Sequence, residues 1–425
     1  MPAPSGTSAP HPGATAHRTA LGRDFRWFFA SRALADTGTE MGAIAIPLMA
    51  IVLLRASPGE VGVIGALSTA AFLVIGLPAG VWVDRARRWP ILFTGALCHG
   101  LVLLSIPLAW YAGVLTLWQV YACVLIGGAT TVFTRVAQQS HLPSLVPDGG
   151  LLRANSALTG ASSTASIAGR GAGGYLVQVA GAPAVVLFNA FTVIGSALAL
   201  LPIRRREPES VPRAGTRLAA DIREGVRFVV GHRLLRPVAV ASVITNLGLN
   251  ALIVMVPVAV LADGGGEGRV GLFFMVGGVG ILLGSLAAGP IAARLGRGRC
   301  LWPTGLCAGA GALAVPFVGE GVWFWVAAGG WALNQFAVGV HNVVQVSLRQ
   351  EVTPDAMLGR MTATMRFLLT GTLTLSAAWS GAVAQTWGVC AALWIGAGLC
   401  GLSWLPLLLS PLRSIREIPQ EYRDV

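Results

Sequence analysis

The sequence contains no lysine, and its basic charge comes from arginine alone. Charged residues make up only 11% of its 425 residues, whereas a soluble protein carries roughly 25%. Because the nucleotide-binding motif G-x-x-x-x-G-K-[S/T] needs a lysine, ATP-driven work by this chain alone is not expected. With 54% of its residues hydrophobic, most of the chain must be solvated by lipid or by itself.

The cysteines are few, and none is spaced as a zinc ligand or as part of a disulfide framework. All six fall within apolar runs, which is typical of small core residues: Cys98, Cys123, Cys300, Cys307, Cys390 and Cys400. No Ser/His/Asp or metal-ligand constellation has a meaningful spacing either. The sequence therefore predicts neither a metal site nor an enzyme.

Long apolar runs dominate the sequence. A bilayer core of ~30 Å needs about 20 helical residues, and twelve runs have that size. They are residues 27–54, 60–83, 89–111, 115–138, 154–179, 184–203, 237–262, 270–293, 300–318, 322–347, 361–386 and 389–410. The predicted fold class is an all-α integral membrane protein with twelve transmembrane helices.

Arginine is distributed unequally between the two sides that these runs define. With the N-terminus inside, only Arg55 and Arg269 fall outside, so both termini are predicted to be cytoplasmic in a multi-pass protein of the cell membrane. The net charge of +12 follows from these turns and not from a basic domain, so nucleic-acid binding is not expected. Residues 1–22 lack the apolar core of a signal peptide and are predicted to be a disordered cytoplasmic tail.

An internal repeat divides the chain into two halves. The turn GVWVDRARRWP at residues 80–90 returns in degraded form as GPIAARLGRGR at 289–299. The pattern P-D-x-x-L-x-R, starting at Pro147, recurs 207 residues later at Pro354. The predicted organisation is two pseudo-symmetric six-helix halves, residues 23–203 and 237–410, joined by a cytoplasmic linker at 204–236 and followed by a tail at 411–425. Within the linker, valines and Phe228 alongside arginines predict a short basic helix on the inner membrane surface.

These motifs resemble those of a known family. The first turn is similar to the signature between the second and third helices of the major facilitator superfamily. Gly160, eight residues and then GRGAGG resemble the superfamily's antiporter signature, although Arg170 stands where that signature has proline. Residues 24–410 as a whole resemble the branch of drug/proton antiporters and of macrolide and siderophore exporters.

The resemblance implies roles for two sets of residues. A cytoplasmic gate is expected at Gly80, Asp84, Arg85 and Arg88, where a carboxylate at a helix end can contact the opposing half. The second set consists of small residues that let helices approach closely: Gly160, Gly169, Gly173 and Gly174.

The first apolar run holds Arg32, Asp36 and Glu40, whose i, i+4, i+8 spacing places them on one helical face. Both acids fall close to mid-bilayer, where an ionised carboxylate costs about 2.5–3.5 kcal/mol. A carboxyl group avoids this cost by taking up a proton, so Asp36 and Glu40 are predicted to couple transport to protons. The alternative is a fixed Arg32–Asp36 ion pair that leaves Glu40 near the outer vestibule.

Arg170 lies in the middle of the fifth run and needs an acceptor, for which Asp36 and Glu40 are candidates. It could bind an anionic substrate or act as a structural counter-ion. Other candidate polar residues of a central cavity are Asn246, Asn250, Asn334 and Gln335. Weaker candidates for the cytoplasmic vestibule are Arg135, Gln138, Gln139 and His141.

Together these features predict a secondary transporter that exports a small amphipathic drug or secondary metabolite by alternating access. The proton gradient is its energy source, no cofactor is needed, and its partners are the substrate and the lipid bilayer, with the chain a monomer. One alternative is a siderophore or organic-anion carrier in which Arg170 and Arg32 bind the substrate. Another is a sensor or membrane enzyme on the same fold.

Overall fold

The computed structural model of the chain describes residues 22–146, 150–203, 218–417, 419 and 422. These residues form α-helices and two short 3-10 helices, with no strand among them. The helices of the first part of the chain are α1 (Arg23–Val52), α2 (Pro58–Arg85), α3 (Arg88–Tyr111), α4 (Leu117–Leu145), α5 (Leu151–Ala180), α6 (Ala182–Leu198) and α7 (Leu218–Gly231). The second part contains α8 (Leu235–Ala262), α9 (Glu267–Leu295), α10 (Leu301–Ala312), η1 (Val315–Phe317), α11 (Val322–Glu351), α12 (Asp355–Trp387), α13 (Val389–Leu402), α14 (Leu405–Leu408) and η2 (Pro411–Arg413).

Local sequence sets several of the helix ends. Helix α2 begins with a capping box, in which the Glu60 amide donates to Ser57 Oγ and the Ser57 amide donates to the Glu60 carboxylate. Helix α5 ends at Ala180 and is followed by its C-cap Gly181, whose φ of +83° glycine adopts at little cost, and α6 starts at the next residue. Each apolar run expected from the sequence contains a helix, and α7 lies within the predicted linker.

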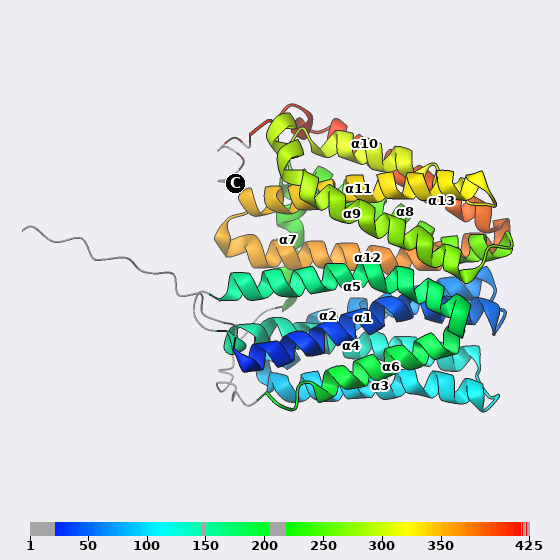
Figure 1. The fold of residues 1–425 in the computed structure, drawn as a ribbon. Coiled ribbons are helices and arrows are strands. Elements are labelled where there is room, and N and C mark those ends of the chain that lie inside the picture. The colour runs from blue at the N-terminus through cyan, green and yellow to red at the C-terminus, as the bar shows by residue number, and fades with distance from the viewer. Residues whose placement is uncertain (1–21, 147–149, 204–217, 418, 420–421, 423–425) are drawn as a thin grey trace, which may run out of the picture.

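Helices α1–α6 form one group and α8–α13 a second, and the chain runs back and forth along one axis (Figure 1). Within the first group α6 packs on both α1 and α3, and α4 packs on α2 and α3. In the second group α11 packs on α9 and α10, and α8 packs on α12 and α13. The two groups meet mainly through α2 with α12 and through α5 with α9.

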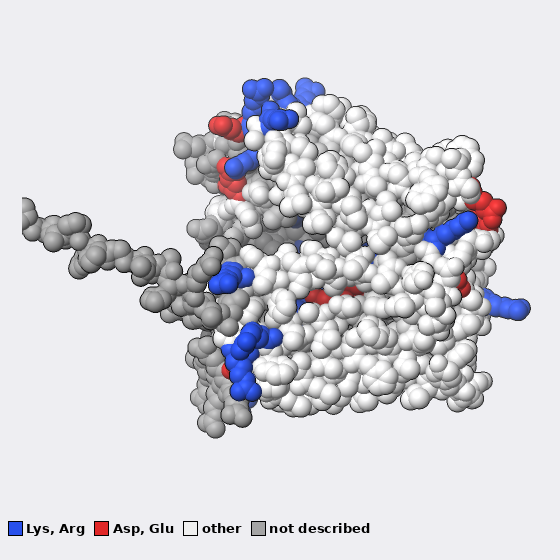
Figure 2. Space-filling view, in the orientation of Figure 1, with Lys and Arg blue, Asp and Glu red and all other residues white. Residues whose placement is uncertain are grey.

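The structure is that of a multi-pass membrane protein. Among the described residues, eight helices are long and apolar enough to cross a bilayer, starting at Arg23, Pro58, Arg88, Leu117, Leu235, Glu267, Met357 and Val389. Two shorter apolar helices cover Ala182–Leu198 and Leu301–Phe317. Figure 2 shows few charged side chains on the flank in view, as expected of a surface that faces lipid.

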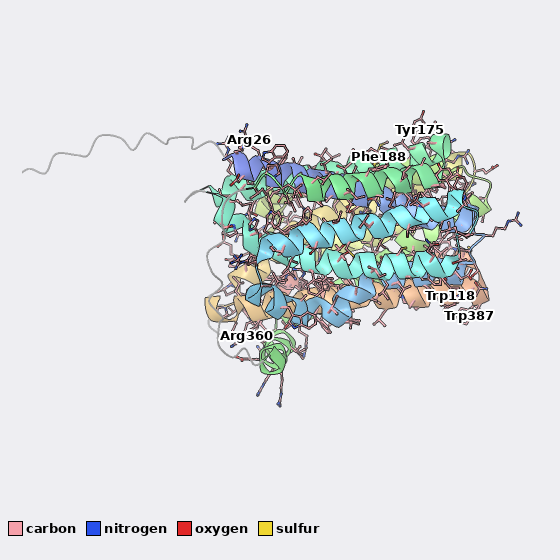
Figure 3. All side chains as sticks on the ribbon, turned by 90° about the horizontal axis from the view of Figure 1, so that it is seen from below. Arg26, Trp118, Tyr175, Phe188, Arg360 and Trp387 are labelled. Carbon is pink, nitrogen blue, oxygen red and sulfur yellow. The ribbon has the colours of Figure 1, made fainter. Side chains whose placement is uncertain are left out.

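Charged side chains concentrate at one end of the bundle, here called the arginine-rich end and marked by Arg23, Arg26, Arg153, Arg294 and Arg360. Figure 2 shows arginines gathered there, and Figure 3 places Arg26 and Arg360 at that end. The opposite end, here called the far end, carries Trp118 and Trp387, whose side chains are exposed (Figure 3). Exposed tryptophans are typical of membrane–water interfaces.

The apolar core is continuous at only one of these ends. The largest buried cluster joins the two groups near the far end, and its members include Leu48 and Val185 from the first group and Leu252 and Phe273 from the second. At the arginine-rich end the core splits into two separate clusters, one in each group. The groups are therefore held together at the far end and separate from each other at the arginine-rich end.

Helix α7 crosses the bundle direction beside the arginine-rich end (Figures 1 and 3). It packs on α12 and α8, with Val229 buried and Glu224 ion-paired to Arg360 at 2.9 Å. Val226 and Val230 are exposed on its outer surface. This position fits the basic surface helix expected from the sequence, and its contact with lipid stays a prediction.

The turn between α7 and α8 contains His232, which is buried and accepts a hydrogen bond from the Leu234 amide at 3.1 Å through Nδ1. The other ring nitrogen faces the carbonyl oxygen of Tyr422 at 3.2 Å. Burial lowers the pKa of His232 below its usual 6.5, although the bond to Tyr422 opposes this shift. The folded chain therefore disfavours the protonated ring more than the unfolded chain does.

We expect the thermal stability of the protein to fall as the pH drops below about 6.5, because protonation removes the Nδ1 acceptor. The stabilisation from neutral His232 is complete above that pH. Replacing His232→Asn, which cannot titrate, should reduce the difference in midpoint between pH 7.5 and 5.5 by about 2 °C. Thermal unfolding in detergent at the two pH values tests this, and an unchanged difference in the variant would contradict it.

Candidate functional site

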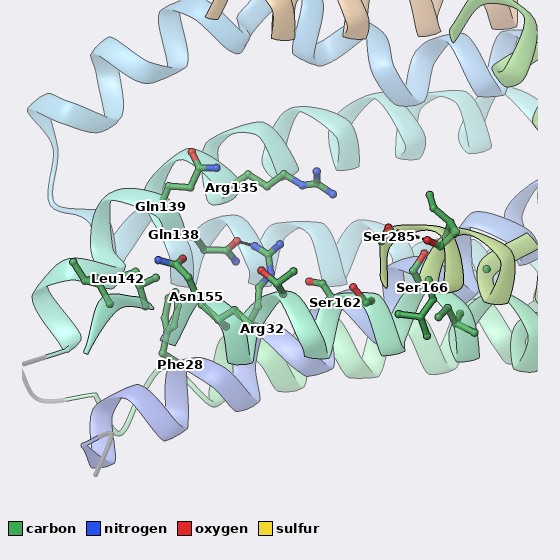
Figure 4. Close-up of a pocket in the computed structure, with 18 of the residues that line it drawn as sticks. Phe28, Arg32, Arg135, Gln138, Gln139, Leu142, Asn155, Ser162, Ser166 and Ser285 are labelled. Carbon is green, nitrogen blue, oxygen red and sulfur yellow. Dashed lines mark hydrogen bonds between the residues drawn. The ribbon is translucent and has the colours of Figure 1, made fainter. Parts of the chain in front are cut away.

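A cavity of about 820 Å³ lies between the two groups of helices, toward the arginine-rich end (Figure 4). Its wall is made by α1, the second half of α4, the first half of α5, the middle of α9 and the first half of α12. The polar lining residues are Arg32, Arg135, Gln138, Gln139, Asn155, Thr159, Ser162, Ser163, Ser166, Ser285 and Arg366. The apolar part of the lining includes Phe28, Leu142, Leu158, Ile167, Ile281 and Leu282.

Beyond this cavity, glycines close the far end. A Cβ atom built on Gly174 of α5 would lie 2.6 Å from the Gly271 nitrogen of α9, so the two backbones are in direct contact. On the other side of the bundle, a Cβ on Gly62 of α2 would lie 2.6 Å from the Cα atom of Gly381 on α12. Both contacts join one group of helices to the other, and they lie nearer the far end than the residues that line the cavity.

The charged face of α1 forms two ion pairs. Arg32 Nε lies 3.0 Å from the Asp36 carboxylate, and Arg32 also donates to Gln138 of α4 (Figure 4). Ser162 of α5 donates its hydroxyl hydrogen to the same carboxylate. Asp36 therefore joins α1 to α5 through Ser162, and Arg32 joins α1 to α4 through Gln138.

One turn farther along α1, Arg170 Nε lies 2.7 Å from the Glu40 carboxylate. Of the two acceptors that the sequence left open for Arg170, the structure pairs it with Glu40. Gly169 makes this approach possible, since a Cβ there would lie 3.0 Å from the Glu40 Cβ. Both side chains are partly exposed, at 32% for Arg170 and 25% for Glu40.

Two further arginines reach the cavity and form no ion pair with a described acid. Arg135 of α4 is exposed to the cavity and has no hydrogen bond or ion pair to any described residue. Arg366 of α12 lies over the ring of Phe72, with 4.8 Å from Cζ to the ring centroid. From the sequence Arg135 was only a weak candidate, and Arg366 was not predicted. An arginine inside the predicted run 361–386 was the signal that could have revealed it.

The four predicted amides lie away from the cavity. Asn246 donates to the Ser242 carbonyl at 2.8 Å, and Asn250 donates to the Leu373 carbonyl at 2.9 Å. Asn334 is fully buried and joins α11 to α10 by donating to Ala308 O, and Gln335 Oε1 is also buried. These side chains satisfy helix backbones or pack between helices, so the structure does not place them where a substrate in this cavity would contact them.

Three of the four predicted helix-packing glycines make close contacts and one does not. Gly169 and Gly173 face α1, where a Cβ on Gly173 would lie 3.1 Å from the Met41 Cα, and Gly174 faces α9. Gly160 has nothing within 4 Å of such a Cβ. The Gly160 side of α5 faces open space in this structure, so its role in helix packing stays a prediction.

The predicted gate lies only partly within the described structure. Gly80, Asp84 and Arg85 belong to the last turns of α2, and their side chains lie outside the described residues. Arg88 is the first residue of α3. In the degraded second copy of the turn, Arg297 pairs with Glu351 of α11 at 2.7 Å, so that contact stays within the second group.

A model of the Major Facilitator Superfamily matches residues 28–373 of the chain. The chain is 24% identical over 209 residues to the Uncharacterized MFS-type transporter YfiS of Bacillus subtilis (strain 168), covering 48% of this chain and 49% of that protein. It is 29% identical over 226 residues to the Uncharacterized MFS-type transporter y4rN of Sinorhizobium fredii (strain NBRC 101917 / NGR234), covering 52% and 54%. The chain spans about half the length of the curated relatives it matches.

Solved structures share the fold at low sequence identity. A bacterial homologue of the iron transporter ferroportin superposes with a TM-score of 0.74 in its inward-facing state, at 14% identity, with coverage of 91% of this chain and 98% of that one. The outward-facing state of a bacterial ferroportin homologue gives 0.58, at 15% identity and coverage of 91% and 99%. A point mutant of the nucleoside transporter NupG gives 0.74 at 10% identity and coverage of 91% and 99%.

Proposed function

The chain belongs to the Major Facilitator Superfamily of membrane transporters, and on that premise we propose that it is a proton-coupled secondary transporter working by alternating access. Its helices α1–α6 and α8–α13 are the two six-helix halves, which rock about the cavity and expose it to each side in turn. The observation that carries this proposal is the cavity itself, which lies between the halves, with glycine contacts joining the halves nearer the far end.

The state of the structure fits an inward-open transporter when the arginine-rich end is taken as cytoplasmic. That orientation follows the excess of arginine at one end and places both termini in the cytoplasm of a cell-membrane protein. The higher TM-score with the inward-facing ferroportin homologue, 0.74 against 0.58 for the outward-facing one, supports the same state. Closing this end and separating the glycine contacts would give the outward-open state.

Asp36 and Glu40 are the proposed proton carriers. When ionised, each is balanced by an arginine, Arg32 or Arg170, which offsets the cost of a carboxylate within the membrane. A proton on either acid removes that balance and leaves its arginine without an anionic partner. Proton uptake can thus change the contacts between α1 and α5, the two helices that the Glu40–Arg170 pair joins.

The proposed transport is export of a small amphipathic drug or secondary metabolite in exchange for protons, by a monomer. A cavity of about 820 Å³ lies within the range of drug-sized ligand sites. Its apolar wall suits a hydrophobic body, and its polar residues suit a polar group. The gate at Gly80, Asp84, Arg85 and Arg88 completes the proposal on the strength of the sequence resemblance.

The test is proton movement driven by a compound in proteoliposomes that contain a trapped pH-sensitive dye. Three probes of one shape but different charge cover the possible substrates: 2-naphthoate, 2-naphthamide and 2-naphthylmethylammonium. A change of internal pH that needs both the protein and a probe would support exchange. If the protein bound a probe and no probe moved protons beyond the rate in protein-free liposomes, a sensor on this fold would be favoured instead.

A further inference from the structure

The cavity has an excess of positive charge. Arg32, Arg135 and Arg366 line it, and no described acidic residue does. Asp36 balances Arg32, whereas Arg135 and Arg366 have no acidic partner among the described residues. Arg135 lies within electrostatic range of Arg32 and Arg366, which repel it, and of Asp36 and Glu40, which attract it. The two acids are already paired with Arg32 and Arg170, so positive charge remains in excess around the cavity.

The two unbalanced arginines belong to different halves of the proposed transporter. Arg135 is on α4, and Arg366 is on α12, where its guanidinium group rests on Phe72 of α2. An anion between them would remove their repulsion and would contact both halves at once. A ligand that touches both halves can favour closing of the cavity around itself.

We propose that the substrate of this transporter is an amphipathic organic anion, whose carboxylate or phosphate group is held by Arg135 and Arg366. This inference rests on the proposed function and specifies its substrate class. A guanidinium group offers paired N–H donors that match the oxygens of either anion. Phe28, Leu158 and Ile281 provide the apolar wall for the rest of the molecule.

The geometry changes which arginines would bind an anion. The alternative drawn from the sequence gave that role to Arg170 and Arg32, but these two are already paired with Glu40 and Asp36. The same charge argues against a free metal cation, because three arginines and no described acid would repel it. The fold that the chain shares with a homologue of an iron transporter therefore does not imply that this chain transports a metal ion.

The test measures binding of the three naphthyl probes to the purified full chain in nonionic detergent by calorimetry. We expect 2-naphthoate to bind about 10-fold or more tightly than 2-naphthamide, because hydrogen bonds to charged groups are the stronger ones. The ammonium probe should bind weakest. Inorganic phosphate should also bind weakly, since it has no apolar part for the cavity wall.

Variants identify the arginines responsible. Arg135→Gln and Arg366→Gln should each weaken 2-naphthoate binding about 10-fold while leaving 2-naphthamide binding unchanged. Arg135→Lys and Arg366→Lys keep the charge and should recover part of the loss. The matched control is Arg294→Gln, which removes the same charge from an exposed position of α9 that does not line the cavity.

Two results would overturn the inference: a preference for 2-naphthylmethylammonium over 2-naphthoate, or unchanged 2-naphthoate affinity in both glutamine variants. Unchanged amide binding shows that a variant is folded, so a lost anion preference is not confused with unfolding. Arginine-dependent binding of 2-naphthoate without any flux would contradict the proposed transport and leave the anion site intact. Proton-coupled flux of only the neutral or cationic probe would support the proposed transport and contradict the anion site.

Discussion

Replacing both Asp36→Asn and Glu40→Gln should reduce proton-coupled flux to the rate of protein-free liposomes. These are the acids of α1 that pair with Arg32 and Arg170 within the predicted span. Amides have nearly the same size and can still accept a hydrogen bond, but they cannot exchange a proton between the two sides. The measurement is probe-driven change of internal pH in proteoliposomes.

A control variant is needed to distinguish a loss of proton coupling from a loss of stability. Removing Glu40 alone leaves Arg170 unpaired, which for a buried pair costs about 3–5 kcal/mol and for this partly exposed one should cost less. Adding Arg170→Gln to Glu40→Gln should restore thermal stability without restoring proton exchange through Glu40. Full proton-coupled flux in the double acid variant would show that protons move by another route.

Gly174→Leu should shift the transporter away from the state in which its far end is closed. The leucine side chain would start 2.6 Å from the Gly271 nitrogen and 3.0 Å from the Glu267 carbonyl oxygen, where backbone atoms cannot easily give way. Overpacking of this kind costs about 1–3 kcal/mol, which corresponds to roughly 5- to 150-fold in the ratio of the two states. Flux should fall because one of the two required states becomes scarce.

Accessibility of the cavity provides the measurement. Ser285→Cys places a thiol on the cavity wall at an exposed position of α9, and a membrane-impermeant maleimide can reach it in inside-out vesicles. Its labelling rate, corrected for the native cysteines, should fall about 10-fold when Gly174→Leu is added. Gly160→Leu on the same helix is the matched control, because nothing lies within 4 Å of its Cβ position. Equal labelling in the two leucine variants would contradict the proposed role of the far-end contact.

Much of the fold could be predicted from local sequence. Hydrophobic length is a property of a continuous segment, so the twelve runs gave the positions of the long helices and α7 was expected within the linker. Helical periodicity placed Arg32, Asp36 and Glu40 on one face. The Arg32–Asp36 pair, at 3.0 Å, joins neighbours of one helical face and needed no knowledge of the other helices.

The contacts between helices required the tertiary structure. Gly160 and Gly169 belong to the same small-residue pattern, yet only Gly169 meets a neighbouring helix. Arg170 had two possible acceptors one turn apart on α1, and the relative position of α1 and α5 decided for Glu40. Asn334 was a reasonable cavity residue until its fully buried position between α10 and α11 was known.

The sequence by itself determined that this chain is a helical membrane protein, where its helices lie and which acids share a face of α1. The tertiary structure decided which of those side chains border the cavity, and it alone brought Arg135 and Arg366 to the same space from positions 231 residues apart. The physical reason is that hydropathy and helix period act within one segment. The rotation and spacing of packed helices depend on side chains from several segments at once.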